Sequence, residues 1–169
     1  IANGTDPCSA ASKPDDFDKD FISDLNDPDD DNDGTLDVND KFFLDTANGM
    51  GTVLPLYYGW NPGDPVRNHV ANTGFTGVQI SSNNPNYVQK QKISVGAAGG
   101  YLAILSDEGT NEGSTNTQTN ALQIGFDATK PFRVHTRITQ PFLGRTPAGK
   151  QAAGLFLGPD EDNYVKLVV

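Results

Sequence analysis

The sequence predicts a mostly β protein, an antiparallel sandwich or barrel, that is preceded by an irregular acidic segment. The 169 residues are 36% hydrophobic and include 18 Gly and 11 Pro, which disfavours a helical bundle and favours short strands joined by turns. From about residue 53, short apolar or alternating runs are separated by clusters of Gly, Pro, Asn and Ser. Before that point aspartate dominates, and neither the helical nor the strand hydrophobic period is present.

The formal charge of −10 is concentrated in one part of the chain. Residues 1–50, here called the head, contain 14 Asp, no Glu and three Lys, whereas residues 51–169, the body, contain eight acidic and nine basic residues. We therefore expect two units, with their boundary near residue 50. The acidity argues against a nucleic-acid partner. No apolar run approaches the roughly 20 residues of a membrane span.

The head contains two 12-residue loops that repeat at a spacing of 13 residues. Each loop has carboxylates at positions 1, 3, 5, 9 and 12. In the first loop, residues 16–27, they belong to Asp16, Asp18, Asp20, Asp24 and Asp27. In the second loop, residues 29–40, they belong to Asp29, Asp31, Asp33, Asp37 and Asp40. The position-7 backbone carbonyls come from Ile22 and Thr35.

This donor set predicts calcium, with two or more ions bound, because Ca²⁺ takes six to eight hard oxygens in a loosely specified shell. Magnesium prefers fewer carboxylates and keeps its waters. Gly34 at position 6 of the second loop allows a sharp turn, whereas the first loop has Phe21 there. The alternative is a solvated acidic linker. If metal binds, it supplies the folding energy of the head.

The run NDPDDDNDGTLDVNDKFFLD resembles thrombospondin type 3 repeats, and the resemblance covers about residues 14–46. It implies a chain that winds around a row of calcium ions with little regular secondary structure, in an extracellular and structural role. Members of that family often add disulfides. Cys8 is the only cysteine here, so it is either an unpaired thiol or the partner of a cysteine outside this chain.

In the body we expect seven strands, at residues 53–58, 76–81, 101–105, 121–126, 132–139, 152–157 and 163–169. Residues 106–120 contain no apolar residue and predict a long loop. The last expected strand runs to Val169, so we also expect the strands to continue beyond this chain.

The closing run QAAGLFLGPDEDNYVKLVV resembles a strand–turn–strand of bacterial concanavalin-A-like lectin/glucanase domains, over perhaps residues 70–169. The resemblance implies an antiparallel jelly-roll sandwich, here incomplete, of a kind often attached to secreted proteins and often glycan-binding. It transfers no binding residue to this sequence.

Two groups of side chains in the body are candidates for ligand binding. Tyr57, Tyr58 and Trp60 form an aromatic cluster that either stacks on sugar rings or fills the junction between head and body. Arg133, His135 and Arg137 share one face of the strand expected at 132–139. They either bind uronate or sulfate groups or form an ordinary solvated face.

The sequence does not predict an enzyme. The acidic residues of the body lie in expected turns or at a strand end, so no pair of carboxylates is positioned for glycoside hydrolysis, and no nucleophile–base arrangement stands out. We expect a non-catalytic, calcium-stabilised module of a secreted or surface-anchored bacterial protein, with a glycan as partner. The alternative is a structural subunit of a fibre or adhesin stalk that self-assembles through strand edges. An inert appendage of a longer enzyme is a third reading.

Overall fold

In the computed structural model the chain is rich in short strands. The structure describes residues 5–6, 8–67, 70–79, 93–105, 109–112, 115–118, 121–139, 146, 151–160 and 162–169. Within these residues it contains nine strands and no helix. The strands are β1 (Asp64–Arg67), β2 (Gly77–Val78), β3 (Ile93–Ala97), β4 (Tyr101–Ile104), β5 (Asn111–Glu112), β6 (Thr115–Asn116), β7 (Leu122–Gln123), β8 (Gly154–Leu157) and β9 (Val165–Val168).

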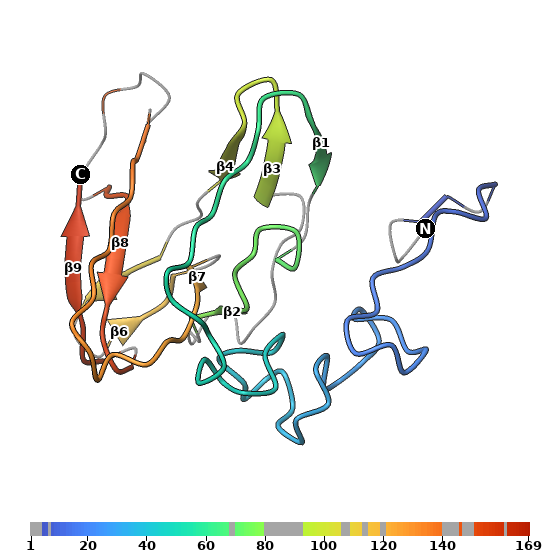
Figure 1. The fold of residues 1–169 in the computed structure, drawn as a ribbon, viewed down its shortest axis with the longest axis horizontal. Helices are drawn as coiled ribbons and strands as arrows, with labels where there is room; N and C mark the ends of the chain where they lie inside the picture. Colours follow the sequence, from blue (N-terminus) through green and yellow to red (C-terminus); the bar gives the residue numbers. More distant parts are fainter. Residues whose placement is uncertain are drawn as a thin grey trace.

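The strands form small antiparallel sheets. β1, β3 and β4 make a three-stranded sheet in which β3 is central, while β2 pairs with β7, β5 with β6, and β8 with β9. In Figure 1 the β8–β9 hairpin and the β1–β3–β4 sheet stand side by side, and the head extends away from them below β2. The fold class is therefore β-rich and antiparallel. Among the described residues no helix is long and apolar enough to cross a membrane.

Several expected strands are confirmed. The runs 101–105, 152–157 and 163–169 contain β4, β8 and β9, and the runs 76–81 and 121–126 contain the shorter β2 and β7. The hairpin expected at the end of the chain is present, with Gly154 opposite Val168 and Leu157 opposite Val165.

Two expected strands are wrong, because residues 53–58 and 132–139 form no ladder. Residues 127–139 are all exposed, and even Phe132, Val134 and Ile138 keep 41%, 45% and 38% of their surface accessible. Alternation alone does not make a strand, because its stability comes from cross-strand pairs and burial.

Two strands, β1 and β3, lie where none was expected, and a hairpin of two further strands, β5 and β6, lies inside a predicted loop. β1 carries Pro65, which is tolerated because β1 is an edge strand of its sheet. β3 follows a polar stretch of sequence and contains Gly96, which pairs with Tyr101 of β4. The short β5–β6 hairpin lies inside the predicted loop 106–120, of which residues 106–108, 113–114 and 119–120 are outside the described part.

The hydrophobic core joins the end of the head to the body. Its buried cluster contains two head residues and three body residues, and partly buried residues from β4, β7 and the segment before β2 pack against it. The cluster consists of Phe43, Leu44, Val70, Val78 and Ile93, with Phe75, Leu102 and Leu122 around it. Residues 41–50 thus lie in the head by composition but pack with the body.

Candidate metal centre

The two aspartate loops adopt the same backbone path. The amide of Asp24 donates to the carbonyl of Asp15 over 3.0 Å, and the amide of Asp37, 13 residues later, donates to the carbonyl of Pro28 over 2.9 Å. These two bonds close the two loops at equivalent points. The sequence repeat is therefore also a structural repeat.

The side-chain hydrogen bonds repeat with the same offset. In each loop the carboxylates at positions 3 and 5 accept the amide two residues further on, which is the geometry of an Asx turn. The bonds are Asp20 N to Asp18 Oδ1 (3.0 Å), Ile22 N to Asp20 Oδ1 (2.6 Å), Asp33 N to Asp31 Oδ1 (3.1 Å) and Thr35 N to Asp33 Oδ1 (2.7 Å). Ile22 and Thr35, whose backbone carbonyls are the predicted position-7 metal ligands, thus lie at equivalent turns of the two loops.

The left-handed turns of the loops also coincide. Lys19 and Asn32 have φ of 69° and 58°, while Phe21 and Gly34 have φ of 80° and 95°. Glycine adopts this region without steric cost, whereas a residue with a Cβ does not. Phe21 therefore holds the position-6 turn in spite of its side chain, which is 97% exposed.

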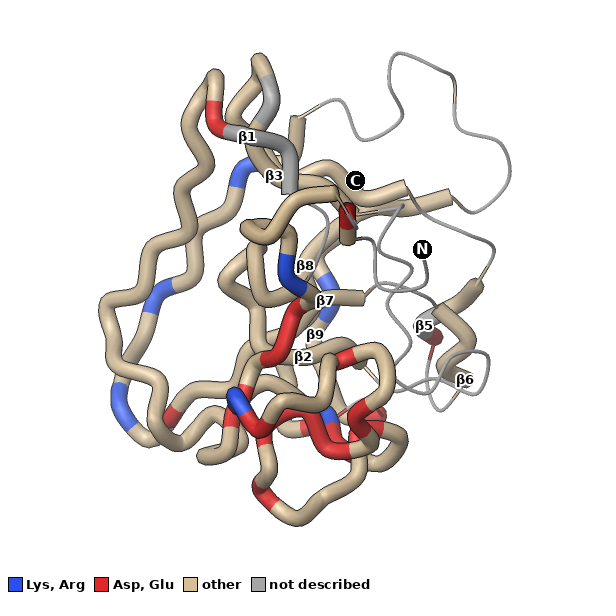
Figure 2. Tube along the Cα trace, turned by 90° about the vertical axis from the view of Figure 1, so that its right-hand side faces the viewer, with Lys and Arg blue, Asp and Glu red and all other residues tan. Residues whose placement is uncertain are grey.

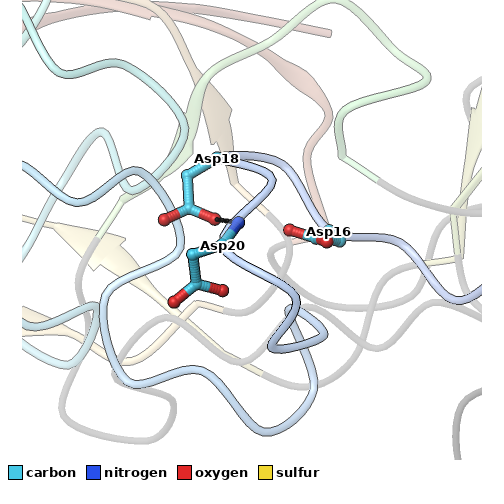
Figure 3. Close-up of side chains that lie close together, drawn as sticks. All are labelled: Asp16, Asp18 and Asp20. Carbon is cyan, nitrogen blue, oxygen red and sulfur yellow. Dashed lines mark hydrogen bonds between the residues drawn. The ribbon is translucent and has the colours of Figure 1, made fainter.

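Each loop brings three carboxylates together. Oxygens of Asp16, Asp18 and Asp20 all lie within 4.8 Å of one another, and those of Asp29, Asp31 and Asp33 do the same. Figure 3 shows the first triplet, with Asp18 and Asp20 adjacent and joined through the Asp20 amide and with Asp16 beside them. Either triplet could hold a metal ion. Figure 2 shows a concentration of acidic residues at the lower end of the molecule, where the head lies, with others scattered over the body.

Each of the remaining predicted ligands, at positions 9 and 12, accepts a backbone amide hydrogen bond with one of its carboxylate oxygens. Oδ1 of Asp24 accepts the amide of Phe17 (2.8 Å), and Oδ1 of Asp37 accepts the equivalent amide of Asp30 (2.9 Å). Oδ1 of Asp27 accepts from Asp29 (3.0 Å), and Oδ1 of Asp40 accepts from Phe42 (2.8 Å). These carboxylates fix the loops whether or not they also contact a metal.

Buried carboxylate oxygens in both loops accept no hydrogen bond. Oδ1 is unpartnered at both position-1 residues, Asp16 and Asp29, and Oδ2 is unpartnered at Asp31 and Asp40. Asp31 and Asp40 are each only 3% exposed. A buried carboxylate oxygen without a partner is costly, so these atoms require a compensating positive group.

Electrostatics agree with this geometry in the second loop. Burial, together with the charges of Asp33 and Asp40, raises the pKa of Asp31 to about 6, although amides of Asp33 and Asp45 oppose the shift. The Asp45 amide itself donates to the Phe42 carbonyl over 2.7 Å. Burial followed by neighbouring aspartates also raises the pKa of Asp37 and of Asp40. The loop thus gathers more negative charge than its surroundings neutralise.

Two asparagines and Asp45 contribute in ways that the motif did not predict. Asn32 Nδ2 donates to Asp18 Oδ2 and so connects the two loops. Asn48 Nδ2 donates to Asp33 Oδ2 over 2.7 Å. Hydrogen bonds from the Thr35 amide, from the Asn48 side chain and from the Thr35 side chain lower the pKa of Asp33. Asp45 accepts the amides of Ala47 (3.1 Å) and Gly49 (2.7 Å), which forms the turn that carries Asn48.

The aromatic cluster divides into one exposed and two packed residues. Tyr57 is 84% exposed. Tyr58 stacks on Trp60 at a centroid distance of 6.3 Å and on Phe75 at 4.7 Å, and burial raises the pKa of its hydroxyl to about 12. Tyr58 and Trp60 are therefore engaged with the body, and Tyr57 alone presents an open ring.

The predicted cationic residues lie on an irregular segment. Arg133, His135 and Arg137 are all exposed, and the segment belongs to no sheet. The common face that a strand would give them is therefore absent, although all three remain open to solvent. Cys8 is exposed and forms no disulfide within this chain.

Comparison with known proteins gives no match, either to a protein family, to a curated protein or to a solved structure.

Proposed function

We propose that the chain is a non-catalytic, calcium-stabilised extracellular module in which the two loops of the head bind Ca²⁺. The observation that carries this proposal is the repeated gathering of three carboxylates by loops with the same hydrogen bonds and the same left-handed turns. The ligands would be the carboxylates of each triplet, with the position-7 carbonyls and the position-12 carboxylates completing the shell.

The choice of calcium rests on the number and type of donors. The first loop offers five aspartates within 12 residues and the second offers six, all with hard oxygens. Calcium accepts six to eight such oxygens at about 2.3–2.6 Å, whereas magnesium requires near-ideal octahedral geometry at about 2.0–2.1 Å and dehydrates reluctantly. An irregular loop with several carboxylates suits the larger ion. Metal would also neutralise the charge that raises the pKa of Asp31.

A structural role for the metal fits the small core. The described part of the chain buries six apolar side chains, namely Phe43, Leu44, Val70, Val78, Ile93 and Val95. Domains with little core commonly depend on metals or disulfides for stability. Cys8 forms no bridge within this chain, and metal bound by the two loops would supply stability of this kind.

For the body we propose a jelly-roll sandwich of the lectin-like type that binds a carbohydrate. The antiparallel sheets and the terminal β8–β9 hairpin support the architecture. The exposed ring of Tyr57 and the exposed cations Arg133 and Arg137 support a sugar or acidic-sugar ligand. The partner would be a glycan outside the cell.

Limited proteolysis tests the metal role. With calcium we expect cleavage to be confined to exposed loops, and with a chelator we expect rapid cleavage within residues 14–46. The matched control adds magnesium in place of calcium. A head that resists protease equally with and without chelator would overturn the calcium proposal. A glycan array run in calcium separately tests the carbohydrate role, and Arg133→Ala with Arg137→Ala tests acidic sugars.

The second candidate is a structural subunit of an extracellular fibre or adhesin stalk. It is favoured by β9, which pairs only with β8 among the described strands. On β9, Val165 and Leu167 are each 66% exposed, so an apolar strand face is open. Exposed strand edges pair readily with further strands. Calcium-dependent growth of particles in light scattering, together with a blank glycan array, would favour this candidate.

A further inference from the structure

The second loop is joined directly to the part of the head that packs into the body core. Phe43 and Leu44 are 5% and 3% exposed and belong to the core cluster. The Leu44 amide donates to the Thr76 carbonyl over 3.1 Å, and Gln123 Nε2 donates to the Lys41 carbonyl over 2.7 Å. Residues 41–44 are therefore held both by apolar burial and by hydrogen bonds exchanged with the body.

The last carboxylate of the second loop begins this segment. Asp40 Oδ1 accepts the Phe42 amide over 2.8 Å, while its Oδ2 is buried and accepts no hydrogen bond. Asp31, within the carboxylate triplet of the same loop, has the same property at its own Oδ2. Asp31 and Asp40 are each only 3% exposed. Backbone amides of the segment that follows, at Phe42 and Asp45, contact the Asp40 and Asp31 carboxylates respectively.

The first loop lacks this degree of burial. In its triplet Asp20 is exposed, and Asp16 and Asp18 are half-buried. The connection of the first loop to the second is made by Asn32, which donates to Asp18. The two loops therefore have the same backbone conformation but differ in two respects. The triplet of the second loop is less accessible to solvent, and only the second loop directly precedes the core residues Phe43 and Leu44.

We propose that the two loops have different roles: metal in the second loop holds Phe43 and Leu44 in the body core, whereas the first loop is an open site that exchanges its metal freely. This inference rests on the proposed metal binding. Without metal, the charges of Asp31 and Asp40 must regain water, and the shortest way is to lift residues 41–44 from the body. Metal binding to the second loop then stabilises the burial of Leu44, and the burial of Leu44 strengthens metal binding by the same free energy.

Hydrogen–deuterium exchange of the Leu44 amide in the full chain measures this link, with CaCl₂ as the probe. At calcium 100 times the dissociation constant, we expect exchange of this amide to slow about 100-fold. Asp31→Asn removes a charged ligand from the second loop, and Asp18→Asn is its matched control at the same position of the first loop. We expect Asp31→Asn to abolish the calcium effect at Leu44 and Asp18→Asn to retain it.

The outcomes separate this inference from the proposed function. If calcium binds in calorimetry but leaves Leu44 exchange unchanged, metal binding stands and the link is wrong. If Asp18→Asn and Asp31→Asn reduce the effect equally, the division of roles is wrong. If no calcium binds, the proposed function itself fails. Leu44→Ala gives the reverse test, because a linked core contact must weaken calcium binding at the second loop while leaving the first loop unchanged.

Discussion

The Phe42 amide donates a hydrogen bond of 2.8 Å to the carboxylate of Asp40, and this bond joins the last acid of the second loop to the core segment. On one side of it lie Asp31 and Asp40, whose burial and then the charge of neighbouring aspartates raise their pKa values. On the other side lie Phe43 and Leu44, which are buried against the body. The last carboxylate of the second loop, Asp40, and the first buried core residue, Phe43, are therefore only three residues apart in the sequence.

Phe21→Gly should strengthen the first loop. Phe21 has φ of 80° and is 97% exposed, so the substitution removes backbone strain and loses almost no packing. The expected gain is about 1 kcal/mol, or roughly fivefold tighter calcium binding at the first loop. Calorimetric titration of the variant against the parent chain measures it.

Gly34→Ala is the matched control in the second loop. Gly34 has φ of 95°, and a Cβ there would meet nothing within 4 Å, so only the backbone conformation is tested. The expected loss is about 1 kcal/mol. If Phe21→Gly weakens calcium binding or Gly34→Ala leaves it unchanged, the left-handed turn is not a requirement of these loops.

Gly49→Ala should destabilise the close contact between the head and the body at Gly49 and Gly125. Gly49 has φ of 83°, and an added Cβ would lie 2.4 Å from Cα of Gly125, an atom that cannot move independently of the backbone. We expect a loss of about 2 kcal/mol or more, seen as a lower thermal unfolding midpoint. Gly63→Ala is the control, because φ there is 89° but nothing lies within 4 Å of the added Cβ. Equal losses in both variants would mean that the close contact contributes nothing.

In the metal-free chain the packed arrangement of the second loop should be stable at pH 5, where Asp31 is protonated, and should be lost as pH rises to 7. The pKa of Asp31 is raised to about 6 from the ordinary value of 3.8, so the folded head holds this proton more tightly than the unfolded chain does. The resulting stabilisation is complete below the unfolded pKa and is lost as pH rises through the folded pKa. Thermal unfolding in chelator across this range measures it.

The stability of the calcium-loaded chain should instead increase as pH rises from 5 to 7, because metal binding requires the deprotonated carboxylate. Asp31→Asn provides the control for both slopes. We expect it to raise the stability of the metal-free chain at pH 7 and to remove most of the stabilisation by calcium. A metal-free chain that becomes steadily more stable between pH 5 and pH 7 would contradict this account of Asp31.

The two aspartate triplets of the head were predictable because the residues that form them are close together in the sequence. Positions 1, 3 and 5 of each loop lie close in sequence, and Asx turns between them follow from the aspartates themselves. The roles of Asn32 and Asn48 were not predictable, because each donates to an aspartate 14 or 15 residues away. Only the folded arrangement of successive loops brings those residues together.

The body was predictable in class but only partly in its elements. The β8–β9 hairpin could be located because two apolar runs flank a turn rich in Asp and Asn, where Asn163 donates to both carboxylate oxygens of Asp160. Residues 132–139 have better alternation than β3 but form no ladder. Pairing depends on a distant partner strand, and periodicity within one segment does not contain that information.

Calorimetric titration of the metal-stripped chain with calcium tests the central claim most directly. The two-loop account predicts two binding events per chain, weak competition by magnesium, loss of one event in Asp31→Asn, and loss of the other in Asp18→Asn. A chain that takes up no calcium, or one whose binding is unchanged in both variants, would show that the paired aspartate loops are not metal sites.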